Sequence, residues 1–317
     1  MFIGCGALNW DIFFRVEKIE ELNLCEFKLK PGEEYVFERE PFLEIYERLK
    51  KIGFLVFQGG GGSAANTIYA LAKFGFKTSF FGAVGDDEFG ERVVEELSAA
   101  SVDMKFIRKG GTTSLALILL DKNNDRTILV SPGSAENYLS FDEKEILLGA
   151  IYHLTSFASQ SGQNFQIKLL NRISSKISFD PGEIYSRKGD TFLIPFIKKT
   201  KFLFLTENEL EFSGLNVDEL LELGVFAIFL KKGKAGAEVI TKKKRIKSSV
   251  YPAQLFVDNT GAGDYFNAGV LAGIFLNLEL EKALTLGLRV ASVSLRDYGR
   301  RGLPDQNEFK NFLSRLK

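Results

Sequence analysis

The alternation of apolar runs with amphipathic helical patterns is the feature that most constrains the fold of this 317-residue chain. Apolar runs such as residues 78–84 and 201–205 predict buried strands. Between such runs, segments like residues 88–97 repeat apolar side chains every four positions and predict helices. Strands separated by helices are typical of βαβ units, so we expect an α/β fold with a mainly parallel sheet flanked by helices on both faces.

Two regions interrupt this alternation, at about residues 11–57 and 112–130. The second has two β-rich runs on either side of the polar segment 121–125, a pattern that predicts a β-hairpin. The first contains residues 41–51, whose apolar spacing predicts a helix. Because the chain has no internal repeat or low-complexity linker, we expect one domain over residues 1–317, with a small β-lid formed by the two insertions.

The balance of charges points to a small-molecule partner. Lysine plus arginine and aspartate plus glutamate each number 41, so no net field recruits nucleic acid or an anionic membrane. No apolar run approaches the length of a membrane span. The two cysteines, Cys5 and Cys25, are too few for a disulfide framework, which fits the cytoplasm. The lone His153 argues against histidine metal sites and histidine-based catalytic triads, and we expect it to be structural.

The segment Asp258 to Asn267 contains a glycine-rich turn that leads into a predicted helix. The first N–H groups of a helix lack partners, and glycines at 261 and 263 would let a phosphate reach them. Asp264 lies on the first turn, where the helix terminus stabilises its ionised form and prepares it to accept a proton. The alternative is an ordinary helix-terminal acid that follows a tight turn.

Two further segments carry groups suited to hydroxyl binding. Glycines at 59–62 precede a predicted helix containing Asn66, but match neither a dinucleotide fingerprint nor a Walker loop. Asn9 and Asp11 follow the first predicted strand, at the end where open α/β sheets bind ligands. A carboxylate beside an amide can bind a vicinal diol. The alternatives are a flexible hinge for the glycines and a solvated strand end for the polar pair.

Taken together in this order, these motifs resemble those of the ribokinase-like, or PfkB, family of carbohydrate kinases over nearly the whole chain. Residues 59–90, ending in Gly-Ala-Val-Gly-Asp-Asp-Glu-Phe-Gly, resemble the first family signature, and residues 258–269 resemble the second. The resemblance implies a kinase that transfers the γ-phosphoryl group of ATP to a primary hydroxyl of a ribose- or fructose-like sugar. It leaves open a nucleoside kinase of the same fold and a catalytically weak sugar- or nucleotide-sensing protein.

The resemblance also implies a role for individual residues. Asp264 is the general base, and Gly261, Ala262 and Gly263 form the anion hole with the Asp264 N–H. The predicted substrate-binding residues are Asn9, Asp11, Gly61, Gly62 and Asn66. The predicted ATP-binding residues are Thr206, Lys232, Gly233, Gly236, Gly261 and Gly263. For a nucleoside, a base slot could use Phe13, Phe14, Leu117 and Leu119, and for a phosphorylated substrate the candidate cations are Arg15, Arg108 and Arg126.

Metal binding follows the same resemblance with one departure. The family usually carries Asn-x-x-Glu after a strand, and here Thr206 stands at the asparagine position while Glu209 keeps the role of organising magnesium through water. A shifted alignment would use Asn208 and Glu211 instead. Asp258 and Thr260 match part of the monovalent-cation site, so potassium is a candidate. Lid strands in such folds often pair between subunits, which makes a homodimer through the lid an expectation.

Overall fold

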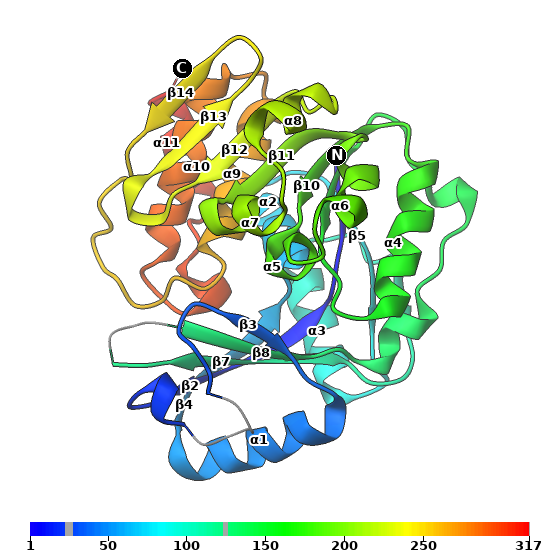
Figure 1. The fold of residues 1–317 in the computed structure, drawn as a ribbon, viewed down its shortest axis with the longest axis vertical. Helices are drawn as coiled ribbons and strands as arrows, with labels where there is room; N and C mark the ends of the chain where they lie inside the picture. The colour runs from blue at the N-terminus through cyan, green and yellow to red at the C-terminus, as the bar shows by residue number, and fades with distance from the viewer. Residues whose placement is uncertain (23–27, 123–125, 317) are drawn as a thin grey trace.

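Two β-sheets of different size organise the chain in the computed structural model, which describes residues 1–22, 28–122 and 126–316 (Figure 1). Within these residues, nine strands form the larger sheet in the order β14-β13-β12-β11-β10-β9-β1-β5-β6. All neighbours from β12 to β6 pair in parallel, and β13 and β14 are added by antiparallel pairing, so the expected mainly parallel sheet is confirmed. Its strands are β1 (Phe2–Cys5), β5 (Thr78–Val84), β6 (Ile107–Lys109), β9 (Ile151–Thr155), β10 (Lys176–Asp180), β11 (Thr200–Thr206), β12 (Ala227–Lys231), β13 (Ala237–Ile240) and β14 (Arg245–Ser248).

Helices cover both faces of this sheet, as the alternation of elements predicts (Figure 1). Successive strand residues point to opposite sides, so Phe2 packs into one apolar core and Ile3 into the other. The helices on the Phe2 side are α2 (Ser63–Lys73), α3 (Glu88–Ala99), α9 (Ala262–Phe275), α10 (Leu280–Ser294) and α11 (Gln306–Ser314). Those on the Ile3 side are α4 (Gln160–Arg172), α5 (Gly182–Ser186), α6 (Asp190–Ile197), α7 (Glu207–Phe212) and α8 (Val217–Glu222).

The smaller sheet combines strands from both predicted insertions and lies beside the larger body (Figure 1). Its described strands, in the order β3-β8-β7-β2-β4, are β3 (Glu34–Val36), β8 (Arg126–Ser131), β7 (Ser114–Leu120), β2 (Asn9–Arg15) and β4 (Phe54–Gly61). The helix α1 (Arg39–Ile52) buries Phe42, Ile45 and Leu49 against one face. The opposite face presents Phe13 toward Tyr298 of the larger body.

Glycines let α9 approach its neighbour closely. A Cβ added at Gly269 would lie 2.7 Å from the Cα of Gly287 in α10, and one at Gly273 would lie 2.9 Å from the Cα of Ala283. Side chains at these positions would push the two helices apart. The close contact places the N-terminus of α9 firmly over the carboxyl ends of the central strands.

Some expectations are corrected or fall outside the described residues. Asn9 and Asp11 follow the first strand, β1, which ends at Cys5, but they lie on β2 of the smaller sheet and not at the end of β1 itself. Pairing of β2 with both β4 and β7 satisfies its backbone there, which outweighs an extension of β1. Cys25 and the centre of the predicted 121–125 turn lie outside the described residues.

His153 and Cys5 are buried in the central sheet. His153 lies on β9, its Nδ1 is 2.9 Å from the Ser178 hydroxyl, and burial lowers its pKa to about 4. The structural role expected for this histidine is therefore confirmed. Among the described residues, no helix is long and apolar enough to cross a membrane.

Candidate active site

Asp264 lies at the start of α9 and faces the start of α2. Gly261 precedes α9 with a φ of 78°, a left-handed conformation that glycine adopts without strain, and Asp264 follows on the first turn. The Ser63 hydroxyl donates to Asp264 Oδ1 at 2.6 Å, and Asn66 Nδ2 donates to Oδ2 at 2.9 Å. The carboxylate is therefore held by two donors from a helix about 200 residues earlier in the chain.

The backbone N–H groups of the predicted anion hole differ in whether they already donate a hydrogen bond. In the described part of the chain, the N–H groups of Gly261, Gly263 and Asp264 have no acceptor, whereas the Ala262 N–H donates to the Asn259 carbonyl at 3.2 Å. Unpaired N–H groups at a helix N-terminus attract an anion. The geometry thus provides an anion site directly beside the Asp264 carboxylate.

Burial controls the protonation of Asp264. Removal from water raises the pKa of its carboxyl to about 6, while the hydrogen bonds from Ser63 and Asn66 oppose that rise. The negative charge of Asp180 adds to the rise, and the positive charge of Lys231 opposes it. A carboxyl in this range is mostly ionised at pH 7 and is more basic than an exposed aspartate, which suits a general base.

Asn9 and Asp11 form a buried polar face on β2 whose acceptors lack partners. Asn9 Oδ1 and Asp11 Oδ1 are both buried and accept no hydrogen bond within the described structure. The Asp11 carboxylate lies so close over Gly61 that a Cβ there would overlap it. Burial raises the pKa of Asp11 to about 7, although Arg300 opposes the rise. Buried acceptors without donors are costly, so this face is suited to a ligand that brings hydroxyl groups.

The predicted glycines 61 and 62 bring this face to Asp264. Gly61 ends β4 and pairs with Asn9 on β2, while Gly62 turns the chain into α2 with a φ of 92°. Since α2 begins one residue later, Ser63 and Asn66 point at Asp264 as soon as the turn is complete. Four of the five predicted substrate residues thus lie together where β2 pairs with the end of β4, and Asn66 links this region to the predicted base.

A cavity of about 410 Å³ opens on the other side of the α9 terminus. Ala262 and Gly263 line it together with Gly233 and Gly236 of the predicted ATP loop. Its remaining surface is mostly apolar, with lining residues that include Tyr251, Pro252, Phe256, Leu288 and Ala291. An apolar slot that ends at free amides has the form expected for a nucleotide base and its phosphates.

Lys231 and Lys234 line this cavity, whereas the predicted Lys232 does not. Lys231 Nζ lies 2.7 Å from Asp180 Oδ2, and Asn267 Nδ2 donates to the same oxygen at 2.6 Å. Lys232 points away and pairs with Glu207 and Glu238 at 3.1 and 2.9 Å. Successive residues of a strand point to opposite sides, so Lys231 and Lys232 at the end of β12 point in different directions. This alternation could have been read from the sequence. Asp180 could also have been anticipated, as an acid that ends a buried strand.

Thr206 and Glu209 form a reciprocal cap at the start of α7. The Thr206 N–H donates to Glu209 Oε2 at 2.7 Å, and the Glu209 N–H donates to Thr206 Oγ1 at 3.1 Å. Burial raises the pKa of the Glu209 carboxyl, the positive charge of Lys231 opposes that rise, and the negative charge of Asp180 adds to it. No group of three or more His, Cys, Asp or Glu side chains that could hold a metal ion occurs in the described residues. The role of Glu209 toward magnesium stays a prediction.

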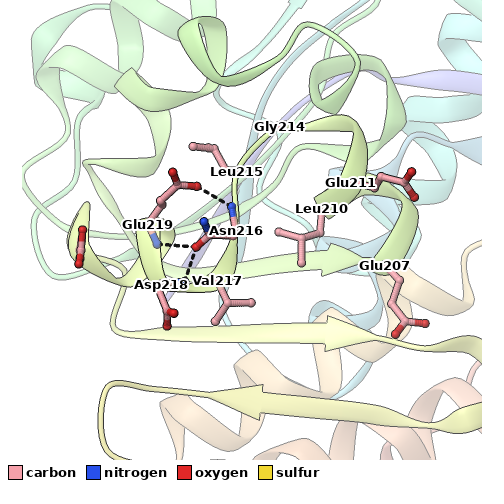
Figure 2. A pocket seen from close by; sticks show the side chains of 10 residues that line it. Glu207, Leu210, Glu211, Gly214, Leu215, Asn216, Val217, Asp218 and Glu219 are labelled. Carbon is pink, nitrogen blue, oxygen red and sulfur yellow. Dashed lines mark hydrogen bonds between the residues drawn. The ribbon is translucent and has the colours of Figure 1, made fainter.

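Glu211 belongs to a different part of the surface. It lines a separate open depression of about 870 Å³ with Glu207 and residues of α8 (Figure 2). There Asn216 accepts from the N–H groups of Asp218 and Glu219, so these polar groups cap a helix (Figure 2). The geometry therefore favours the pair Thr206 and Glu209 over the shifted alignment, in which Asn208 is also exposed.

Asp258 braces the turn before α9. Its Oδ1 accepts from the N–H and the hydroxyl of Thr260 at 3.0 and 2.8 Å, and its Oδ2 accepts from the Gly299 N–H at 3.1 Å. These bonds join the glycine turn to the C-terminal loop. The potassium role of Asp258 and Thr260 stays a prediction.

The residues predicted to contact a nucleoside base lie on two different faces of the smaller sheet. Phe13 faces the site with Phe57 and Tyr298, whereas Phe14, Leu117 and Leu119 lie in the core on the α1 side and cannot form a base slot. The three arginines considered for a phosphorylated substrate also lie in different parts of the structure. Arg15 lies beside Tyr298, Arg126 lines the nucleotide cavity and donates to the Asn259 carbonyl, and Arg108 pairs with Glu145 elsewhere.

The comparisons with known proteins agree with this geometry. The model of the pfkB family of carbohydrate kinases matches residues 43–306. The chain therefore belongs to the pfkB family, and it is a phosphotransferase with an alcohol acceptor.

Relatives support the same family, and a solved structure supports the fold. The chain is 33% identical over 74% of its length to an uncharacterized sugar kinase of Archaeoglobus fulgidus, of which 98% is covered. It is 27% identical to an ATP-dependent ribose-1-phosphate kinase of Halopiger xanaduensis, over 98% of this chain and 97% of that one. The nucleoside kinase structure from Methanocaldococcus jannaschii superposes with a TM-score of 0.77 at 24% identity, covering 99% of this chain and 98% of that chain. The ribokinase-like fold class is thereby confirmed.

Proposed function

We propose that the protein transfers the γ-phosphoryl group of ATP to a primary hydroxyl of a ribose- or fructose-like sugar. The observation that carries the proposal is the position of Asp264. It lies between the unsatisfied acceptors of Asn9 and Asp11 on one side and the nucleotide cavity on the other. The base, the acceptor and the phosphate therefore meet at the first turn of α9.

In the proposed reaction, the acceptor hydroxyl attacks the γ-phosphorus while Asp264 takes its proton. The new O–P bond forms as the bond from the γ-phosphorus to the β–γ bridging oxygen breaks, and ADP leaves. The amides of Gly261, Gly263 and Asp264 stabilise the charge on the transferring group, and Lys231 adds a positive charge beside it. Magnesium, when bound, neutralises charge on the phosphates, and Glu209 is placed to hold its water. We propose the smaller sheet as the lid that excludes water during transfer.

Asp264→Asn is the direct test of the base. We expect turnover to fall about 100- to 10,000-fold because the amide cannot accept the proton, while sugar binding persists. Calorimetry measures the binding, and coupled ADP release measures the turnover. Near-normal turnover would contradict the assignment.

The same variant gives an independent check on stability. The raised pKa means that an ionised Asp264 costs stability, a penalty absent below about pH 4 and complete above about pH 6. The free energy of unfolding of Asp264→Asn should therefore exceed that of the wild type by about 1–3 kcal/mol at pH 7 and match it at pH 4. Equal stabilities at pH 7 would contradict the raised pKa.

A nucleoside acceptor is the second candidate, favoured by the aromatic groups beside Asp11. Phe13 lies two positions after Asp11 on the same face of β2, 5.3 Å from the ring of Phe57, which stacks with Tyr298. A base could insert against these rings while its ribose meets Asn9 and Asp11.

An acceptor panel separates the candidates. It contains ribose, fructose, ribose-1-phosphate, adenosine and inosine, each with ATP and magnesium in the presence and absence of potassium. Turnover of the free sugars supports the first proposal, and turnover of nucleosides alone supports the second. Binding without turnover of any acceptor would favour a sensing protein.

The lid also bears on oligomeric state. Phe54 and Leu55 are 72% and 44% exposed on β4, an edge strand of the smaller sheet. We propose that two copies pair through this lid, because an exposed apolar edge is suited to strand pairing. Light scattering that shows a monomer at working concentration would contradict the pairing.

A further inference from the structure

Arg300 reaches from the C-terminal turn Gly299–Gly302 into the acceptor side of the cleft. Its side chain is 5% exposed. The Arg300 Nε donates to Asn66 Oδ1 at 3.0 Å, and Nη2 donates to the Gly61 carbonyl at 3.3 Å. Nη1 lies 3.3 Å from Glu96 Oε2, and the guanidinium lies over the Tyr69 ring. One buried guanidinium thus contacts groups from β4, α2 and α3.

These contacts fix the orientation of the Asn66 amide. A guanidinium can only donate, so the amide must turn its oxygen toward Arg300. The amide nitrogen then faces Asp264 and donates to Oδ2 at 2.9 Å. In the flipped orientation, the amide NH₂ would face the guanidinium and the amide oxygen would face the carboxylate, and both contacts would be repulsive. Arg300 therefore acts together with the Asp264 carboxylate to keep the Asn66 donor directed at Asp264.

The surroundings of Arg300 keep its guanidinium in place. Glu96 accepts from the Gly60 N–H at 2.9 Å through the same oxygen that pairs with Arg300, so the glycine strand and the arginine are held together. Gly299 is tied to Asp258 in the turn before α9. Because both ends are anchored, the fork of Arg300 has little freedom to leave Asn66.

We propose that Arg300 is a positioning residue for phosphoryl transfer, acting through Asn66 to keep a hydrogen-bond donor on Asp264. With one side of the carboxylate held, its remaining lone pairs stay directed at the acceptor hydroxyl. This inference rests on the proposed role of Asp264 as general base. It predicts that the loss of Arg300 changes the base without any direct contact to the substrate.

The kinetic test compares Arg300→Lys with Arg301→Lys, its neighbour, which pairs with Asp297 on the surface. Lysine keeps the charge beside Glu96 but cannot make the forked contacts, so we expect the kcat of Arg300→Lys at pH 7 to fall about tenfold or more. The acid limb of its pH profile should move to higher pH, because the carboxylate loses a fixed donor. Arg301→Lys should match the wild type. A loss that is equal at every pH would indicate a merely structural role and would overturn the proposal.

A double-mutant cycle tests whether Arg300 acts through Asn66. In the Asn66→Ala background, Arg300→Lys should lower kcat by less than about threefold, because its target is already absent. If the fold-losses in kcat of the two single variants multiply in the double variant, the proposal is overturned. If Arg300→Ala folds with a melting temperature near that of the wild type, added guanidinium ion should restore part of its activity.

Hydrogen exchange of the Asn66 side-chain amide tests the inference without a measurement of turnover. The side-chain NH₂ of Asn66, identified by its loss in Asn66→Ala, should exchange slowly in the wild type and in Arg301→Lys and faster in Arg300→Lys. Equal exchange in all three would overturn the contact between Arg300 and Asn66. A wild-type protein with slow exchange but no turnover of any acceptor would instead contradict the proposed function, so the two failures are distinguishable.

Discussion

The two halves of the cleft differ in how their polar groups are satisfied. On the acceptor side, Asn9 Oδ1 and Asp11 Oδ1 are buried without partners. On the nucleotide side, the Asp180 carboxylate is paired with Lys231 and bonded by Asn267. The comparison teaches that a cation of the chain itself balances the buried carboxylate on the nucleotide side, although Asn267 Oδ1 has no partner there. On the acceptor side the buried oxygens have no donor from the chain, as binding of a hydroxyl-bearing ligand would require.

The electrostatics follow the same division. Burial raises the pKa of Asp11 to about 7 and that of Asp264 to about 6. Burial also opposes ionisation of Asp180, but the charge of Lys231 outweighs it and lowers the pKa of that carboxyl below its usual range. The contrast is between Asp11 and Asp264 on one side and Asp180 on the other, since burial raises the pKa of Glu209 as well.

Lys231→Met should destabilise the protein and impair the nucleotide side of the site. It leaves Asp180 buried without its cation, so we expect about 3–5 kcal/mol lower stability and a fall of about 100-fold in kcat/KM for ATP. Lys232→Met is the matched control, and steady-state kinetics and denaturant unfolding measure both variants. An equal or larger loss in the control would support the sequence-based choice of Lys232.

Asp11→Asn should affect only the acceptor half. A carboxylate can accept two hydroxyl hydrogens, and the amide oxygen replaces only part of that capacity, so we expect the acceptor KM to rise about tenfold or more. The KM for ATP serves as the internal control and should stay unchanged. The melting temperature should rise, because a buried unpartnered carboxylate is removed. A rise in both KM values would contradict the division of the cleft.

The dependence of kcat/KM on pH should reflect the ionisation of the carboxyl groups on the acceptor side. Asp264 and Asp11 act in their ionised forms, so kcat/KM should fall as pH decreases through 7 and 6, by about tenfold or more at pH 5. Lys231 lowers the pKa of Asp180, so this carboxyl stays ionised as the pH falls to 5. Initial rates from pH 5 to pH 9 measure the effect. A profile that stays flat down to pH 5 would show that neither carboxyl titrates as described.

Thr206→Asn should have the smallest effect. Asparagine can replace the threonine as an N-cap, so stability should change by less than about 1 kcal/mol. The KM for magnesium-ATP should change by less than about threefold, since Glu209 keeps its position. Thr206→Ala removes the cap and provides the contrast. A large gain in activity for Thr206→Asn would show that threonine impairs this site.

Local patterns in the sequence predicted much of the fold and part of the site. The strand β5 and the helices α1 and α3 fall where apolar spacing predicts them. The glycine turn before α9 was readable because a helix N-terminus needs only neighbouring residues to form an anion site. Lys231 and Asp180 could have been anticipated from their positions at strand ends, but Arg300 has no such local signal. Arg300 binds Asn66 from 234 positions away, and no periodicity in either segment indicates that contact.

By itself, the sequence determined the α/β class, the two glycine–helix junctions and the acid on the first turn of α9, because strand and helix periods and backbone freedom are local properties. Only the tertiary structure decided that Asn9 and Asp11 belong to the smaller sheet and that Asn66 joins Arg300 to Asp264. The physical reason is that burial and pairing between distant segments set the charge and orientation of these side chains.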